Sequence, residues 1–147
     1  MENVSGGTHF SLGVASEGSL WTWGRNNFGQ LGQGTSSDLS EPTRVSTGTN
    51  WKLAAAGNVH AFAITTDAEL WGWGRNKVGQ VGLGWTSSKV TTPQKHNATG
   101  WNDVEVGTGH TIAVLNEENL KGWGWNDYGQ LGIGHKSNKK SPQAIQF

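Results

Sequence analysis

The stretch Leu70–Gly84, LWGWGRNKVGQVGLG, carries two tryptophans and five glycines within fifteen residues. Glycine permits positive φ and close approach of neighbouring backbone, whereas tryptophan supplies a large apolar surface for burial. This mixture would suit a phosphate-binding loop, a sugar-stacking site or a tightly turned β-structure. The rest of the sequence decides between these three interpretations.

The same pattern occurs three times, at a spacing of fifty residues. The sister stretches are WTWGRNNFGQLGQG, which ends at Gly34, and KGWGWNDYGQLGIG, which ends at Gly134. A histidine-bearing block precedes each copy, and a proline (Pro42, Pro93 or Pro142) follows it. Residues that recur in every unit are expected to serve the fold. They are His9, His60, His110, Trp23, Trp73, Trp123, Asn26, Asn76, Asn126, Gly29, Gly79, Gly129, Gln30, Gln80 and Gln130.

Each unit predicts four short strands and no helix. In the second unit the strands are expected at 51–57, 60–66, 69–74 and 92–97, the last of them short and polar. Because side chains alternate along a strand, Trp71 and Trp73 share one face. Tandem four-stranded units of about fifty residues predict an all-β protein built of β-propeller blades. We expect a single repeat domain, 1–147, divided into repeats 1–50, 51–100 and 101–147.

The unit resembles the regulator of chromosome condensation repeat. The family's hallmarks are a GxxHT.A strand, an L..WG.N..GQLG segment and a strand led by proline, and all three occur in each unit. GTGHTIAV and WGWNDYGQLGIG are close matches, whereas GTHFSLGV is one residue shorter before its histidine and the second unit has Val81 in place of leucine. The resemblance implies a propeller, usually of seven blades, that binds proteins through its faces and loops.

Units that open with tryptophan, as at Trp51 and Trp101, look like bacterial or phage versions of the repeat. The family's eukaryotic founder is a nucleotide-exchange factor for the GTPase Ran and binds chromatin, and bacterial relatives include an inhibitor of β-lactamases. No loop of this chain matches one that would carry exchange activity.

Three blades do not close a propeller, because rings form with roughly four to eight blades. Two edges would stay open, and an open sheet edge favours pairing with another chain. We expect a homodimer that closes a six-bladed ring, a fragment of a longer repeat protein, or a larger assembly that covers both edges.

Several classes of site are disfavoured. The sequence contains no GK dipeptide for a Walker loop and no GxSxG for a nucleophilic serine. His9, His60 and His110 suggest a three-histidine metal site, but one histidine per unit is better explained by the fold. Eleven basic and eleven acidic residues give no charged surface for nucleic acid, and no apolar run is long enough to span a membrane. We therefore expect a non-enzyme without cofactor or metal, and the sequence carries no signal peptide.

Residues that differ at one register are the candidates for recognition. Trp85 stands where the other units have Thr35 and His135, and Trp125 replaces arginine. An exposed tryptophan of this kind is either an interface anchor or a ring packed under a loop. The candidate interaction residues are Trp85, Trp125, Arg25, Arg75, Tyr128 and His135.

Three functions follow as hypotheses. The leading one is a scaffold that binds protein, including its own copies, as a structural part of a bacterial surface or phage particle. The second is a lectin, in which Trp85 and Trp125 would stack on carbohydrate. The third is an exchange factor or enzyme inhibitor acting on an unidentified protein.

Overall fold

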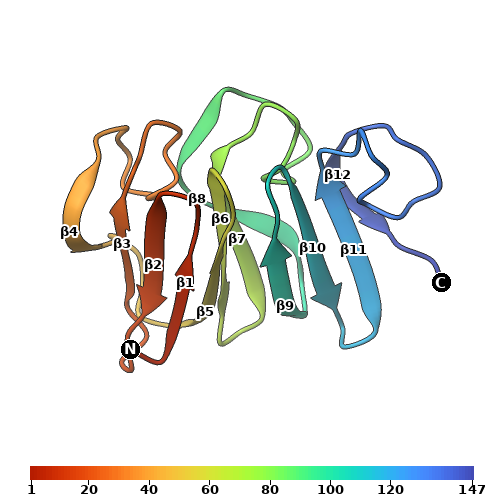
Figure 1. The fold of residues 1–147 in the computed structure, drawn as a ribbon. Helices are drawn as coiled ribbons and strands as arrows, with labels where there is room; N and C mark the ends of the chain where they lie inside the picture. Colours follow the sequence, from red (N-terminus) through yellow and green to blue (C-terminus); the bar gives the residue numbers. More distant parts are fainter.

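The computed structural model describes residues 1–147 and shows twelve strands and no helix. The strands form three separate four-stranded sheets, which stand side by side in an arc (Figure 1). The first blade comprises β1 (Asn3–Gly6), β2 (Phe10–Val14), β3 (Leu20–Gly24) and β4 (Leu39–Arg44). The second comprises β5 (Trp51–Ala56), β6 (His60–Thr65), β7 (Glu69–Arg75) and β8 (Lys89–Thr99), and the third β9 (Trp101–Val106), β10 (His110–Leu115), β11 (Asn119–Gly124) and β12 (Lys139–Ala144). The prediction of all-β propeller blades is confirmed.

Within each blade, strands that follow one another in the chain pair antiparallel. Neighbouring blades meet mainly through their first strands: β1 and β2 contact β5, and β5 and β6 contact β9. We call the contact between the first and second blades the first joint, and that between the second and third blades the second joint. The two chain ends lie at opposite ends of the arc (Figure 1). The first and third blades therefore each keep one side that no other blade covers.

The outer strand of the second blade is longer than predicted. β8 has eleven residues, because it continues past the proline and pairs with the start of β7 at Glu69 and Thr99. Its equivalents β4 and β12 have six residues each. Nor is β8 uniformly polar, since Val90 and His96 are buried. The strand predicted at 92–97 lies within β8, but the prediction that it is short and polar was wrong, because Val90, Pro93 and His96 of β8 are buried.

The strand register also corrects the alignment of the histidines. His60 pairs with Gly74 and His110 with Gly124, but in the first blade it is Phe10 that pairs with Gly24. His9 lies one position earlier and is exposed. A shift of one residue turns a strand side chain to the opposite face. His9 is thus not the counterpart of the other two histidines, and Phe10 takes its place.

The core lies between the blades. One apolar cluster spans the first joint and another the second. Trp73 and Trp123 are completely buried there. Burial of one indole removes about 150–250 Å² from water, which is worth about 4–6 kcal/mol as an upper bound. Trp23 holds the same register but is only half-buried, because no blade packs against its side of the first blade.

Candidate protein-interaction surfaces at the joints and open faces

Each joint is made by a tryptophan that docks on the glycine-rich turn of the preceding blade. The indole Nε1 of Trp73 donates to the backbone oxygen of Gln30 at 2.8 Å, and Trp123 donates to that of Gln80 at 3.0 Å. The turn passes directly under the ring: a Cβ added to Gly82 would lie 2.5 Å from Nε1 of Trp123. The glycines that suggested a phosphate loop therefore make room for a tryptophan.

The recurring asparagine and glutamine hold this turn in shape. In each blade the asparagine Oδ1 accepts from the backbone N–H five residues later, at 3.0–3.2 Å. Its Nδ2 donates to the following loop, for example from Asn76 to the oxygen of Trp85 at 3.0 Å. The glutamine side-chain oxygen accepts from the N–H two residues earlier, at 2.8–3.0 Å. These bonds lie within one repeat, so each blade shapes its own socket.

The outer part of each joint is a backbone contact. The N–H of Gly34 donates to the oxygen of Thr91 at 2.8 Å, and that of Gly84 to the oxygen of Lys140 at 2.7 Å. The blades approach so closely that a Cβ on Gly79 would lie 2.5 Å from the Cα of Lys140. Only glycine fits this approach.

The inner ends of the two joints differ in polarity. In the second joint the Thr111 hydroxyl donates to the oxygen of Gln80 at 3.0 Å and accepts from Nε2 of His60, also at 3.0 Å. Burial lowers the pKa of His60 to about 3, and nearby His110 contributes in the same direction. The matching positions of the first joint hold Phe10 and Ala61, which share one apolar cluster.

Both ends of the arc expose surfaces that are covered inside the joints. We call the side of the first blade that carries Trp23 the tryptophan face, and the side of the third blade that carries Gln130 the glutamine face. Nε1 of Trp23 and the N–H of Gly134 have no hydrogen-bond partner. Gln130 is half-buried, whereas Gln30 and Gln80 are 1% and 3% exposed. The two faces thus hold the two halves of an unmade joint.

The structure brings together some of the candidate interaction residues. The Arg75 guanidinium lies over the ring of Phe28 in the preceding blade, 4.7 Å from its centroid. Arg75 also lines a cavity of about 280 Å³ between the second and third blades, together with Trp125. The ring of Trp125 packs edge-on against Tyr128 at 5.5 Å, and Tyr128 itself is 79% exposed. Arg25, at the register of Arg75, is exposed on the first blade.

Two other candidates lie apart from this cavity. Trp85 and His135 occupy equivalent loop positions, where their backbone oxygens accept from Asn76 and Asn126. The Trp85 side chain is 46% exposed and does not line the cavity that Trp125 lines.

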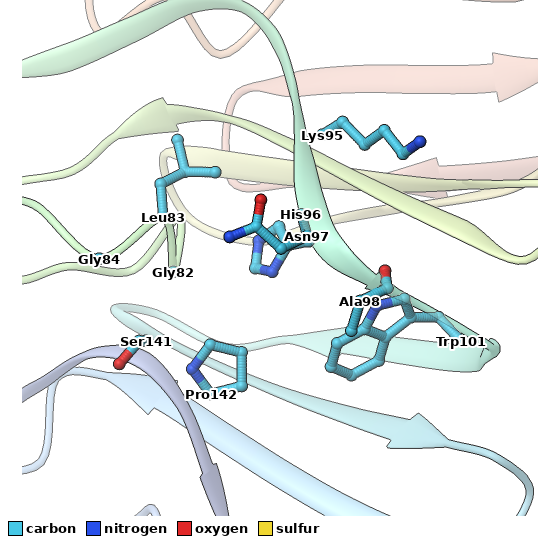
Figure 2. A pocket seen from close by; sticks show the side chains of 10 residues that line it. All are labelled: Gly82, Leu83, Gly84, Lys95, His96, Asn97, Ala98, Trp101, Ser141 and Pro142. Atoms are coloured by element: carbon cyan, nitrogen blue, oxygen red, sulfur yellow. Dashed lines mark hydrogen bonds between the residues drawn. The ribbon is translucent and has the colours of Figure 1, made fainter.

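A further cavity of about 290 Å³ opens at the outer part of the second joint. Figure 2 shows His96 and Trp101 on one side of it and Pro142 on the other. Nε2 of His96 donates to the oxygen of Val81 at 2.8 Å, and the ring centroid lies 5.3 Å from that of Trp123. Burial lowers the pKa of His96, so the ring is neutral near pH 7.

Sequence reasoning missed His96. The signal was its register: it follows Lys95, which pairs with Trp71, and so stands where the other blades have Val45 and Ile145. Val45, His96 and Ile145 each follow the proline of their repeat by three residues, but counting by fifty misaligns them because Pro93 lies one residue later than that spacing predicts.

No group of three histidine, aspartate or glutamate side chains lies close enough to hold a metal ion. The structure also contains no helix suited to crossing a membrane.

Comparison with known proteins decides the family. Models of the regulator of chromosome condensation (RCC1) repeat match residues 17–64, 67–114 and 122–147, and a second model of the repeat matches 2–30, 51–80 and 100–130. The chain belongs to the RCC1 repeat family.

Three known proteins are similar to this chain over short segments. The human E3 ubiquitin-protein ligase HERC2 is 41% identical over 44 residues, which cover 30% of this chain and 1% of the ligase. The ultraviolet-B receptor UVR8 of Arabidopsis thaliana is 36% identical over 65 residues, 43% of this chain and 15% of the receptor. Mouse protein RCC2 is 40% identical over 55 residues, 36% of this chain and 11% of that protein.

Two solved structures share the fold over nearly the whole chain. Prp20p of Saccharomyces cerevisiae superposes with a TM-score of 0.88 at 22% identity and covers 98% of this chain. Human WBSCR16 gives a TM-score of 0.85 at 21% identity, with the same coverage. The three blades span 38% of the Prp20p chain and 40% of the WBSCR16 chain.

Proposed function

We propose that this chain is a non-enzymatic propeller scaffold that binds protein, including further copies of itself, through its two open faces. One observation carries the proposal. The tryptophan face presents an indole without a partner, and the glutamine face presents the glycine-rich turn that receives an indole in both formed joints. Because the two faces are the two halves of one kind of joint, they complement each other.

The number of blades that a closed propeller needs supports self-association. Two copies of the three-bladed arc supply six blades, which falls within the range of about four to eight in which propellers close. Three copies would supply nine, outside that range. A head-to-tail ring of two copies contains two identical joints and leaves no open face.

The relatives support protein binding as the general role. Yeast Prp20p binds Gsp1p and histones, and it has also been crystallised bound to Kap60. What we carry over is the use of the propeller as a binding surface, and not exchange activity. The match to HERC2 covers 1% of that ligase, so it transfers no enzymatic activity.

The oligomeric state of the purified chain tests this function. Light scattering coupled to size-exclusion chromatography, over a wide range of protein concentration, should give twice the mass of the chain. Native mass spectrometry should give the same result. A mass of one chain at every concentration would contradict the proposal of self-association.

A further inference from the structure

We propose that the open faces join two copies head to tail through a polar joint, in which His110 of one copy bonds Ser11 of the second copy and Tyr128 receives the second copy's Arg25. This inference rests on the proposed function and names the partner and the contacts. It starts from the two joints already present in the chain, because each fixes which register positions face one another.

The second joint supplies the template for the inner end. There a histidine of one blade, His60, bonds the hydroxyl of the next blade's Thr111 at 3.0 Å, and this hydroxyl bonds the oxygen of Gln80 at 3.0 Å. Thr111 pairs across its sheet with Trp123, the tryptophan that docks on the same oxygen. One backbone oxygen therefore accepts from both a hydroxyl and an indole.

The open faces carry the same pair of groups. His110 is the counterpart of His60 on the glutamine face, since both pair with the glycine after the docking tryptophan. Ser11 is the counterpart of Thr111 on the tryptophan face, since it pairs with Trp23. A histidine on one face thus meets a hydroxyl on the other. Both side chains are half-buried and have no side-chain hydrogen bond.

The first joint shows that this match is specific. Its corresponding positions hold Phe10 and Ala61, an apolar pair with no hydrogen-bonding group. A histidine facing alanine would bury an N–H without an acceptor, which is costly. The chain avoids that mismatch in both formed joints, and a second copy avoids it again with His110 and Ser11. A second copy therefore meets each open polar group of this face with a matching partner.

A second pair of side chains, an arginine and an aromatic residue near the turns, supports the same head-to-tail arrangement. In the first joint Arg75 lies over Phe28 of the preceding blade at 4.7 Å. The equivalent groups at the open faces are Arg25 and Tyr128, and both are exposed. Tyrosine also accepts a cation on its ring face. The same head-to-tail register therefore places a cation against an aromatic ring.

The backbone groups complete the register. Gly34 and Gly84 each donate to an outer strand of the next blade, at Thr91 and Lys140. The corresponding donor on the glutamine face is Gly134. The acceptor Thr91 directly follows Val90, which pairs with Gly74. In the first blade Leu39 pairs with Gly24, so the next residue, Ser40, is the matching acceptor on the tryptophan face. At Gly29 and Gly79 the next blade packs directly against the glycine. The equivalent space beside Gly129 is free, because a Cβ added there would meet nothing within 4 Å in one copy.

Exchange of the polar pair for the apolar pair tests the inner contact. Ser11→Ala and His110→Phe should each weaken association by about 10- to 100-fold, because each leaves a buried polar group without its partner. The double variant reproduces the pair of the first joint and should recover most of the loss. Equal masses for all four proteins across the concentration range, or losses that simply add in the double variant, would overturn the contact.

Charge exchange tests the outer contact. Arg25→Glu and Tyr128→Lys should each weaken association several-fold. In a chain that carries both changes each joint again pairs opposite charges, so association should recover. Trp85→Ala is the matched control, because Trp85 lies outside the proposed joint, and it should leave the mass unchanged. Thermal unfolding of each variant checks the fold.

The outcomes separate the two proposals. A wild-type chain that is monomeric at all concentrations overturns both self-association and this joint. A wild-type chain that assembles, with variants at positions 11, 25, 110 and 128 that assemble equally well, overturns the joint and leaves the scaffold function standing.

Discussion

Acidification should destabilise this protein through His60, in a window set by its pKa. The ring is completely buried, its Nε2 bonds Thr111, and its Nδ1 has no hydrogen-bond partner. Since the Thr111 hydroxyl donates to Gln80, it accepts from His60, so Nε2 carries the proton and Nδ1 is unprotonated. Protonation of Nδ1 would place an unpaired charge in the core. Burial consequently lowers the pKa of His60 to about 3.

The sign and size of the effect follow from linkage. The pKa of the unfolded-state histidine is about 6.5, so below that pH the unfolded chain binds a proton that the folded chain refuses until about pH 3. Folding stability is therefore complete above pH 6.5 and falls as the pH drops through this window. The slope approaches about 1.4 kcal/mol per pH unit, which amounts to about 2 kcal/mol between pH 7 and pH 5. Burial also lowers the pKa values of His96 and His110, so both add to the loss.

Urea unfolding followed by tryptophan fluorescence at pH 7 and pH 5 measures this loss. The informative variant is His60→Phe/Thr111→Ala, because it copies the pair Phe10 and Ala61 of the first joint. It should lose about 2 kcal/mol less than the wild type on going from pH 7 to pH 5. An identical loss in both proteins would show that His60 takes up its proton in the folded state, and would refute the reasoning.

Four further substitutions have defined outcomes. Gly82→Ala should lower the free energy of unfolding by about 2–4 kcal/mol, because the new Cβ would lie 2.5 Å from Trp123. Gly84→Ala places its Cβ near no neighbouring atom and should lower the free energy of unfolding by only about 1 kcal/mol, because of its positive φ. Chemical denaturation measures both changes. Asn76→Ala leaves the Val81 N–H and the loop oxygen unpaired and should cost about 2–4 kcal/mol, seen as a lower thermal midpoint. His96→Val copies the residue at this register in the first blade and should leave stability at pH 7 within about 1.5 kcal/mol while reducing its loss at pH 5.

Much of the blade could be predicted from the sequence because its signals are local. The asparagine and glutamine bonds join residues within one repeat, so a motif that recurs every fifty residues already contains both partners. Strand alternation put Trp71 and Trp73 on one face, and the structure buries Trp73 completely and Trp71 by about half. The same local reasoning failed at His9, where alignment by residue type displaced the register by one, and at His96, where an apolar position holds a histidine.

The candidate site could be predicted only in part. Arg75 was selected because Trp125 replaces it in the third repeat, but its contact with Phe28 joins two blades and has no trace in either repeat alone. Trp85 and Trp125 were selected because neither recurs in the other repeats, and whether their side chains line the same cavity could not be read from that pattern.

By itself the sequence determined the number of blades, their strands and the glycine-rich turn, because propensity, alternation and short-range hydrogen bonds act within one repeat. Tertiary structure decided which residues form joints and which form open faces. Trp73 and Trp23 occupy the same motif, yet one is completely buried and the other half-buried. The difference is the presence of a preceding blade, whose turn supplies the acceptor of Trp73 from 43 residues away. Burial and hydrogen-bond satisfaction depend on such neighbours, which a repeat does not encode in its own residues.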